Sequence, residues 1–243
     1  MVLTFDDGLA ECHEFIAPLL KKKGVPAAFF LNNHFIDDRG LFYRYKASLL
    51  IEQVRSDPRI LERVAGYLDI PEKRVVESIL LIDQDQVSLL DALILEAELD
   101  LARYLKESPV YMNTKQVMEL VDWGFEIGGH SPDHTDMSRL DPRELIRQVK
   151  SSISDLQARF QVSTRYFSFP FTSAGIPIDV IHKLLDEGVA KVLLGTAGLK
   201  KTGKSGYFQR IPMEEFNSPA GQALNTEYLY YLLKGILGRN AIR

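Results

Sequence analysis

The sequence has little cysteine, no excess of positive charge and no long apolar run, and each absence excludes a class of protein. Cys12 is the only cysteine among 243 residues, so no disulfide forms within the chain and a thiolate-rich metal site is excluded. The net charge is -4 with a pI near 5.8, and Lys and Arg form no block or stripe. We therefore expect no nucleic-acid partner, because binding of that kind needs a basic surface.

The apolar runs are too short to cross a membrane. The most leucine-rich stretch, residues 78–95, is broken by Asp83, Asp85 and Asp91. The first residues lack the basic region and apolar core of a signal peptide, because Asp6 interrupts them at once. These features predict a soluble, cytoplasmic protein without a membrane span. A site so close to the first residue leaves open an upstream segment, which would change the expected location.

What the sequence does contain is an alternation of strand-like and helix-like segments, with 46% hydrophobic residues. Strands are expected at residues 2–5, 25–31, 125–127, 165–170, 192–194 and 207–212. Helices are expected between them, at residues 11–23, 114–123, 141–160 and 178–187. Six or so strands separated by helices predict parallel α/β architecture, and this length favours a barrel-like closure over an open sheet.

Residues 41–107 depart from this alternation. Apolar residues recur there at three- and four-residue spacing, as on the buried faces of successive helices. No catalytic residue types cluster in the segment. We predict a helical insertion at 41–107 within a single domain that spans residues 1–243.

Ionisable side chains follow two of the predicted strands, at the ends where parallel α/β folds collect their chemistry. Asp6 and Asp7 follow the first strand, and His130 and His134 follow the strand that ends in a glycine pair. Ser131 as N-cap and Pro132 as first helical residue predict a helical turn that places both histidines on one side.

Each of these two motifs is weak alone, because Asp-Asp-Gly is a common turn and His-x-x-x-His is frequent by chance. Together they predict a metal site with two histidines and one carboxylate, the second carboxylate remaining free as a base. Three protein ligands with open positions are typical of a catalytic rather than a structural zinc site.

These segments resemble the motifs of the polysaccharide deacetylases, carbohydrate esterase family 4. Thr4–Gly8 (TFDDG) resembles the first motif, and His130–His134 (HSPDH), with its Glu-Ile-Gly lead-in, resembles the second. Phe167–Phe171 (FSFPF) resembles the third motif in the form common among exopolysaccharide and capsule deacetylases. Gln209–Pro212 (QRIP) resembles the strand that closes the domain in that subgroup. The resemblance covers the chain except the helical insertion.

The resemblance implies a distorted, incomplete (β/α) barrel of the TIM type with about seven strands. It implies a metal-dependent hydrolase that removes N-acetyl groups from an amino-sugar polysaccharide or oligosaccharide. Asp6 would be the general base, and Asp7, His130 and His134 would bind a divalent ion, most often Zn²⁺. The backbone N–H of Phe171 would contact the oxyanion of the tetrahedral intermediate.

Two departures from the family pattern keep alternatives open. Ser168 stands where many members have an arginine that orients the catalytic aspartate, and Arg165 or Arg210 is a candidate replacement. No late histidine is in place as the general acid, since His182 lies within a predicted helix. The alternatives are a catalytically impaired protein that retains the metal and binds carbohydrate, and a hydrolase of small cyclic amides on the same fold.

Overall fold

Six short segments form one parallel sheet in the computed structural model, which describes residues 2–213, 219–237 and 240–242. Every strand pairs in parallel with the strand that precedes it in the chain, so each connection crosses back over the sheet. The strands are β1 (Leu3–Phe5), β2 (Ala27–Leu31), β3 (Glu126–Gly129), β4 (Tyr166–Ser168), β5 (Val192–Gly195) and β6 (Tyr207–Gln209).

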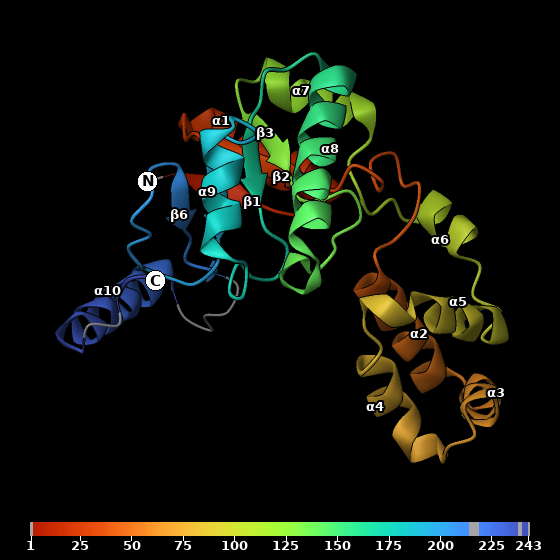
Figure 1. The fold of residues 1–243 in the computed structure, drawn as a ribbon. Helices are drawn as coiled ribbons and strands as arrows, with labels where there is room; N and C mark the ends of the chain where they lie inside the picture. The colour runs from red at the N-terminus through yellow and green to blue at the C-terminus, as the bar shows by residue number, and fades with distance from the viewer. Residues whose placement is uncertain (1, 214–218, 238–239, 243) are drawn as a thin grey trace. The chain divides into compact units, whose positions relative to one another are not determined.

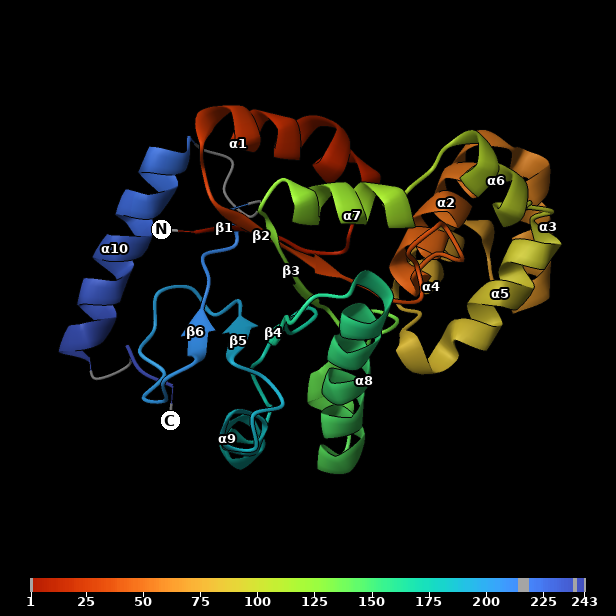
Figure 2. The ribbon, with the colours of Figure 1, turned by 90° about the horizontal axis from the view of Figure 1, so that it is seen from above.

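Figure 2 shows these strands in sequence order along a curved sheet. The expected distorted, incomplete barrel is confirmed, with six strands among the described residues where about seven were predicted.

The first layer of helices packs on the outside of β1, β2 and β3. It contains a π-helix (Cys12–Ile16) that continues as α1 (Ala17–Lys23), together with α7 (Thr114–Asp122). Buried residues of these helices and strands form one apolar cluster, with Phe29 at 1% exposure. Gly24 ends α1 at φ 63°, in agreement with the helix stop predicted there.

The second layer packs on β3, β4 and β5 and consists of α8 (Pro142–Phe160) and α9 (Ile178–Asp186). Both helices lie in front of the strands in Figure 1. The Asp141 side chain accepts hydrogen bonds from the N–H groups of Arg143 and Glu144, so α8 begins as its sequence predicts. The final helix, α10 (Ala220–Ile236), follows β6.

Contacts within the chain define two units. Unit 1 comprises Met1–Ile36 and Met112–Arg243, and unit 2 comprises Asp37–Tyr111. Unit 2 contains α2 (Tyr43–Ser56), α3 (Pro58–Leu68), α4 (Val75–Leu80), α5 (Val87–Glu96) and α6 (Leu101–Glu107). It has an apolar core of its own, in which Leu50 and Leu90 are fully buried. The Asp38 carboxylate accepts hydrogen bonds from the N–H groups of Val110 and Tyr111, both at 2.9 Å, and thereby joins the two ends of this unit.

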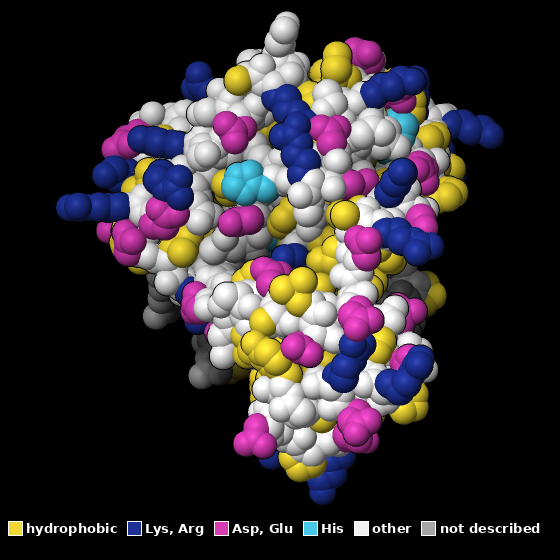
Figure 3. All heavy atoms as spheres, turned by 90° about the vertical axis from the view of Figure 1, so that its right-hand side faces the viewer, with side chains coloured by type: hydrophobic (Ala, Val, Ile, Leu, Met, Phe, Trp, Pro, Cys, Tyr) yellow, Lys and Arg dark blue, Asp and Glu magenta, His cyan; other side chains and the backbone are white. Residues whose placement is uncertain are grey.

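The surface of the described residues is mixed in charge where Figure 3 displays it. Basic and acidic side chains are interspersed on that face. Across the described ranges, no helix is both long enough and apolar enough to cross a bilayer.

Candidate active site

The candidate site lies where β1 and β3 end. Asp6 and Asp7 follow β1, and His130 follows β3. The glycine pair before His130 is required by close packing: a Cβ on Gly128 would lie 2.6 Å from the Phe30 ring, and one on Gly129 would lie 2.5 Å from Ser152 Oγ. Larger residues would displace β3 and the histidine that follows it.

The segment that carries the two histidines is a loop, so the predicted helical turn is wrong. Ser131 and His134 have φ of 60° and 58°, in the left-handed region. Ser131 Oγ accepts a hydrogen bond from the Thr135 N–H at 3.1 Å. The physical reason lies at the end of β2, where the Asn32 amide donates to the carbonyl oxygens of His130 and Ser131. These oxygens would accept from the following turn in a helix, and Asn32 satisfies them in its place.

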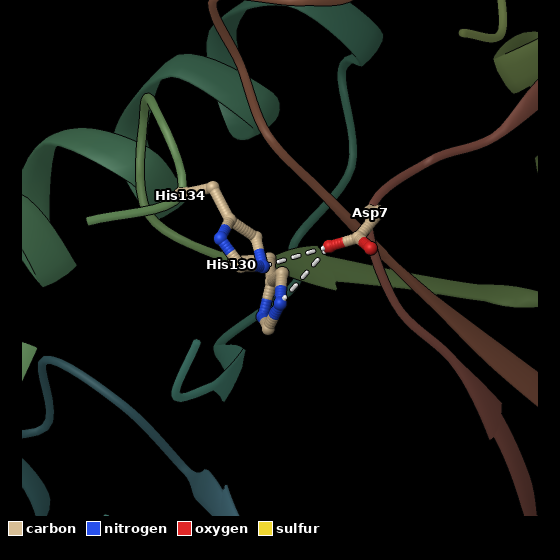
Figure 4. Close-up of side chains that lie close together, drawn as sticks. All are labelled: Asp7, His130 and His134. Atoms are coloured by element: carbon tan, nitrogen blue, oxygen red, sulfur yellow. Dashed lines mark ion pairs between the residues drawn. The ribbon is translucent and has the colours of Figure 1, made fainter. Parts of the chain in front are cut away.

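Asp7, His130 and His134 converge although a loop replaces the helix (Figure 4). The Nε2 atoms of His134 and His130 lie 3.0 Å and 3.4 Å from Asp7 Oδ1. The three ligand atoms all lie within 4.8 Å of one another, and both histidines are buried. Asp7, His130 and His134 are therefore close enough together to coordinate a single metal ion.

The hydrogen bonds around these residues suit a cation. His130 Nδ1 lies 2.8 Å from the Ser168 carbonyl oxygen, to which it donates, so Nε2 faces Asp7 and carries the lone pair whenever the imidazole is neutral. Asp7 Oδ1 is buried without a hydrogen bond among the described residues, and the two imidazole Nε2 atoms are its polar neighbours. Two imidazole nitrogens and one carboxylate oxygen are a donor set that Zn²⁺ accepts, so the residues present fit a divalent ion.

The pKa values of the group show which charge it favours. Burial acts to raise the pKa of Asp7, but the imidazoles of His130 and His134 outweigh it and hold that pKa well below its usual range. Burial acts to lower the pKa of His130, but the carboxylates of Asp6 and Asp7 outweigh it and raise that pKa. The site therefore favours positive charge between its carboxylates, which either a proton or a metal ion supplies.

Asp6 lies beside this group and is held by Arg210. The guanidinium donates to both carboxylate oxygens, from Nη1 to Oδ1 at 2.8 Å and from Nη2 to Oδ2 at 2.7 Å. Ser168 Oγ lies 3.1 Å from Asp6 Oδ2 and accepts from Arg210 Nη2 at 2.6 Å. Of the two candidate replacements for the missing arginine, Arg210 thus occupies the place at Asp6. Arg165 is exposed just before β4, at the opposite end of the strands from the site.

The ionisation of Asp6 follows from these neighbours. Burial acts to raise its pKa, but the positive charge of His130 and the hydrogen bond and charge of Arg210 lower it below the usual value. The distance from Asp6 Oδ2 to His130 Nε2 is 3.8 Å. Asp6 is therefore a carboxylate at neutral pH, adjacent to the three candidate ligands.

Phe171 lies against the same site. It follows Pro170 in the loop after β4 with φ of 56°. Its ring meets the His134 ring edge to face, with centroids 4.5 Å apart, and its carbonyl oxygen accepts from Thr196 Oγ1 at 2.9 Å. The peptide after Phe171 is fixed by this bond, which holds the residue beside the histidine loop.

The remaining histidines lie elsewhere. His182 is on α9, His13 is 2.9 Å from Glu119 and stacks on Trp123, and the backbone N–H of the exposed His34 donates to the Pro132 carbonyl oxygen. None of these three imidazoles forms a hydrogen bond or ion pair with Asp6 or Asp7 in the described part of the chain.

Asn32 is the functional residue that the sequence prediction missed. The available signal was a pair of asparagines, Asn32 and Asn33, directly after an apolar strand, where buried amides need partners. Asn33 donates to the Ser152 carbonyl oxygen at 2.9 Å and thereby joins β2 to α8.

Solved structures with similar folds have low sequence identity to this chain. The Streptococcus pyogenes deacetylase PplD, in complex with acetate, gives a TM-score of 0.50 at 14% identity, over 86% of this chain and 62% of that one. IcaB from Ammonifex degensii gives a TM-score of 0.51 at 13% identity, over 93% of this chain and 71% of that one. The de-N-acetylase from Aggregatibacter actinomycetemcomitans gives a TM-score of 0.51 at 14% identity, over 93% of this chain and 74% of that one. The chain thus spans about two thirds of the length of these proteins, and their likeness shows the fold.

No curated protein matches the chain. A family model does match it, over residues 1–68 and 85–185, which is well over half of the sequence. That model is the one for polysaccharide deacetylase, and its match includes Asp6, Asp7, His130, His134 and Phe171. The chain belongs to the polysaccharide deacetylase family.

Proposed function

We propose that the chain is a metal-dependent hydrolase that removes N-acetyl groups from an amino-sugar polysaccharide or oligosaccharide, in the manner of the exopolysaccharide and capsule subgroup. One observation carries this proposal: Asp7, His130 and His134 converge on one point, with the ionised Asp6 fixed beside them. Similar structures that are described as a deacetylase and a de-N-acetylase support the choice of reaction.

Asp7, His130 and His134 would hold the divalent ion, most often Zn²⁺ in sites with this donor set. A bound ion would acidify water and polarise the amide carbonyl. The Ser168 carbonyl oxygen keeps His130 in the tautomer that presents Nε2. Asn32 holds the backbone of the histidine loop, so the two rings need no large rearrangement to serve as ligands.

Asp6 would act as the general base that takes the proton of the attacking water. Its carboxylate is held by two parallel N–H···O bonds from Arg210, which fix the orientation of the carboxylate. Its lowered pKa keeps it unprotonated at neutral pH, the state that a base requires.

The backbone N–H of Phe171 would donate to the oxyanion that develops as the amide carbon becomes tetrahedral. The Thr196 hydroxyl donates to the Phe171 carbonyl oxygen, and the Phe171 ring packs against the His134 ring. A donor fixed in this way stabilises the developing charge without the cost of reorganising.

The test is acetate release from N-acetylglucosamine oligomers by the zinc-loaded protein. We expect release from the wild type and none from Asp6→Asn, while calorimetry shows that the variant still binds one zinc ion. Asp155→Asn, which changes an exposed aspartate on α8, is the matched control and should behave as wild type. Acetate release that survives Asp6→Asn would show that Asp6 is not the base.

The second candidate function is carbohydrate binding without turnover. The observation that favours it is the placement of His13, His34 and His182, none of which forms a hydrogen bond or ion pair with Asp6 or Asp7 in the described ranges. Oligosaccharide binding by the zinc-loaded wild type with no acetate release over a long incubation would establish this function. A wild type without zinc affinity would point instead to the hydrolase of small cyclic amides.

A further inference from the structure

The last helix turns one side toward its own unit, and that side is mixed: Ala223 is buried, and Leu224, Glu227, Tyr231 and Lys234 are half-buried. In α10, the dark blue helix of Figures 1 and 2, Ala223 is the buried residue and Glu227 lies on the same side one turn later. Glu227 Oε1 accepts a hydrogen bond from the Leu199 N–H at 2.8 Å, which attaches the helix to unit 1. Lys234 also lies on this side and is half-buried, with its ammonium over the Tyr230 ring. The helix thus contacts unit 1 through a narrow side on which apolar and polar groups are mixed.

The opposite face of α10 is apolar and solvent-exposed. Its side chains are each more than half exposed: Tyr228 at 58%, Leu229 at 59%, Leu232 at 63%, Leu233 at 51%, Ile236 at 83% and Leu237 at 68%. They follow the i, i+3, i+4, i+7 spacing that forms a continuous stripe along a helix. An amphipathic helix normally buries such a stripe, so this face is suited to a partner.

The stripe is symmetric about its midpoint. The centre lies between Leu232 and Leu233, and the members pair about it as Leu229 with Ile236 and Tyr228 with Leu237. An antiparallel pair of identical helices related by a two-fold axis brings such pairs together, because residue i of one copy then meets residue j of the other and the reverse.

The N-terminal end of the apolar stripe, at Tyr228, coincides with the point where the helix of an antiparallel partner would end. Before Tyr228 the same face of the helix carries Thr226, Asn225 and Gln222. In the symmetric pairing, Asn225 would lie opposite position 240 of the second copy, which is beyond the end of its helix at Ile236. Those positions would remain in water, which accounts for their polar side chains.

We propose that α10 is a self-association surface, on which a second copy of this chain docks its own α10 in antiparallel orientation. The exposed part of the six side chains offers roughly 600 Å² on each copy, or about 1,200 Å² in total, at the lower end of the range for specific interfaces. Leucine and tyrosine side chains without charged neighbours on the stripe are typical of the centre of such interfaces. Interfaces at this end of the range are typical of weak, reversible association.

Charge favours a second copy over a lipid surface. A helix that lies on a membrane usually has a polar face rich in Lys and Arg that points to water. The charged residues of α10 are one lysine and one glutamate, Lys234 and Glu227, and both lie on the side that is turned toward unit 1.

Sedimentation equilibrium from 1 to 200 µM tests the proposal. We expect a monomer–dimer equilibrium for the wild type and a dissociation constant at least 100-fold higher for Leu233→Glu, because each copy would place a carboxylate in the centre of the contact. The matched control is Leu95→Glu, which changes an even more exposed leucine of unit 2 and should dimerise as the wild type does. A wild type that stays monomeric at 200 µM, or equal loss of dimer in both variants, overturns the proposal.

Disulfide cross-linking tests the orientation. Leu229→Cys mixed with Ile236→Cys should yield a disulfide-linked dimer under mild oxidation, whereas Leu229→Cys alone should not. Cys12 does not compete, since it is buried. Cross-linking of Leu229→Cys with itself would indicate parallel helices and refute the antiparallel pairing. Flotation of a monomeric wild type with vesicles of phosphatidylcholine and phosphatidylserine would show that the stripe binds lipid instead.

Discussion

Replacement of Arg210 by methionine removes the charge at Asp6 while it keeps a long side chain over the Phe30 ring, 5.8 Å from the guanidinium carbon. Four hydrogen bonds are lost, to Thr4, Ser168 and both oxygens of Asp6. The two to Asp6 measure 2.8 Å and 2.7 Å and involve charges on both partners. Hydrogen bonds to charged groups contribute about 1.5–3 kcal/mol each. Asp6 is 26% exposed, so water recovers part of this, and we expect the free energy of unfolding at pH 7 to fall by about 2–3 kcal/mol.

The effect on the proposed reaction follows from the same bonds. If the misoriented base stabilises the transition state by about 2 kcal/mol less, the reaction is about 30-fold slower. We therefore expect kcat/KM for acetate release to fall by about that factor. Arg210 also lowers the pKa of Asp6, hence the acid limb of the pH–rate profile should move to higher pH in Arg210→Met. Arg210→Lys keeps the charge and loses the two-pronged geometry, so its rate should fall while its acid limb stays in place.

The pH dependence of unfolding provides a readout that is independent of turnover. The pKa of Asp6 is lower in the folded chain than its usual 3.8, so its contribution to stability is complete above that pH and disappears as the pH falls through the folded value. The difference in unfolding free energy between wild type and Arg210→Met should therefore shrink as the pH is lowered below 4.

Arg165→Met is the matched control, because Arg165 is the other arginine that the sequence offers for this role. Its side chain is exposed at the start of β4. We expect Arg165→Met to have the same kcat/KM, the same acid limb of the pH–rate profile and the same free energy of unfolding as the wild type. The reasoning is refuted if Arg165→Met loses as much activity as Arg210→Met, or if Arg210→Met keeps both its rate and its acid limb.

Three further predictions concern the metal, the thiol and unit 2. A chelator should lower the melting temperature of the zinc-loaded protein, because free zinc at 1,000 times its dissociation constant adds about 4 kcal/mol to the free energy of unfolding. His134→Ala should abolish this response. An unchanged melting temperature of the wild type would contradict the zinc site. Burial raises the pKa of Cys12 from 9.0 to about 12, so an aromatic disulfide reagent at pH 8 should modify the thiol only after unfolding. The free energy of unfolding should decline as the pH rises from 9 to 12, because only the thiol of the unfolded chain ionises in that range. Rapid modification of the native protein would contradict the buried placement. Leu90→Ala, in the core of unit 2, should cost about 2–4 kcal/mol of unfolding free energy in a denaturant titration and leave zinc affinity measured by calorimetry unchanged; loss of zinc binding under native conditions would show that the site depends on that core.

The sequence predicts the elements of unit 1 well where the signal is local. The start of α8 is set by an N-cap carboxylate at Asp141 and the proline that follows, and the end of α1 is set by a glycine in the left-handed conformation at Gly24. Such signals act within a few residues of backbone, so they need no knowledge of the tertiary fold.

The histidine loop shows where local signals fail. Ser131 and Pro132 favour a helical turn, but the Asn32 amide binds the carbonyl oxygens that the turn would need. Asn32 lies 98 residues before His130 in the chain, and only the pairing of β2 with β3 brings the two together. A propensity of a few tenths of a kcal/mol per residue does not outweigh two buried hydrogen bonds.

The sequence by itself determined the alternation of strands and helices, and it placed Asp6, Asp7, His130 and His134 at the same end of the strands. Both follow from the periodicity of apolar residues and from parallel strand direction, which are properties of short segments. Only the tertiary structure decided that Arg210, and not Arg165, holds Asp6, and that the apolar stripe of α10 faces outward. The choice of Arg210 depends on the curvature of the sheet, which brings the residue after β6 to the end of β1 across 204 residues of chain. The packing of the Glu227 side of α10 on unit 1 sets the second, since a helix that turns one face inward must expose the other.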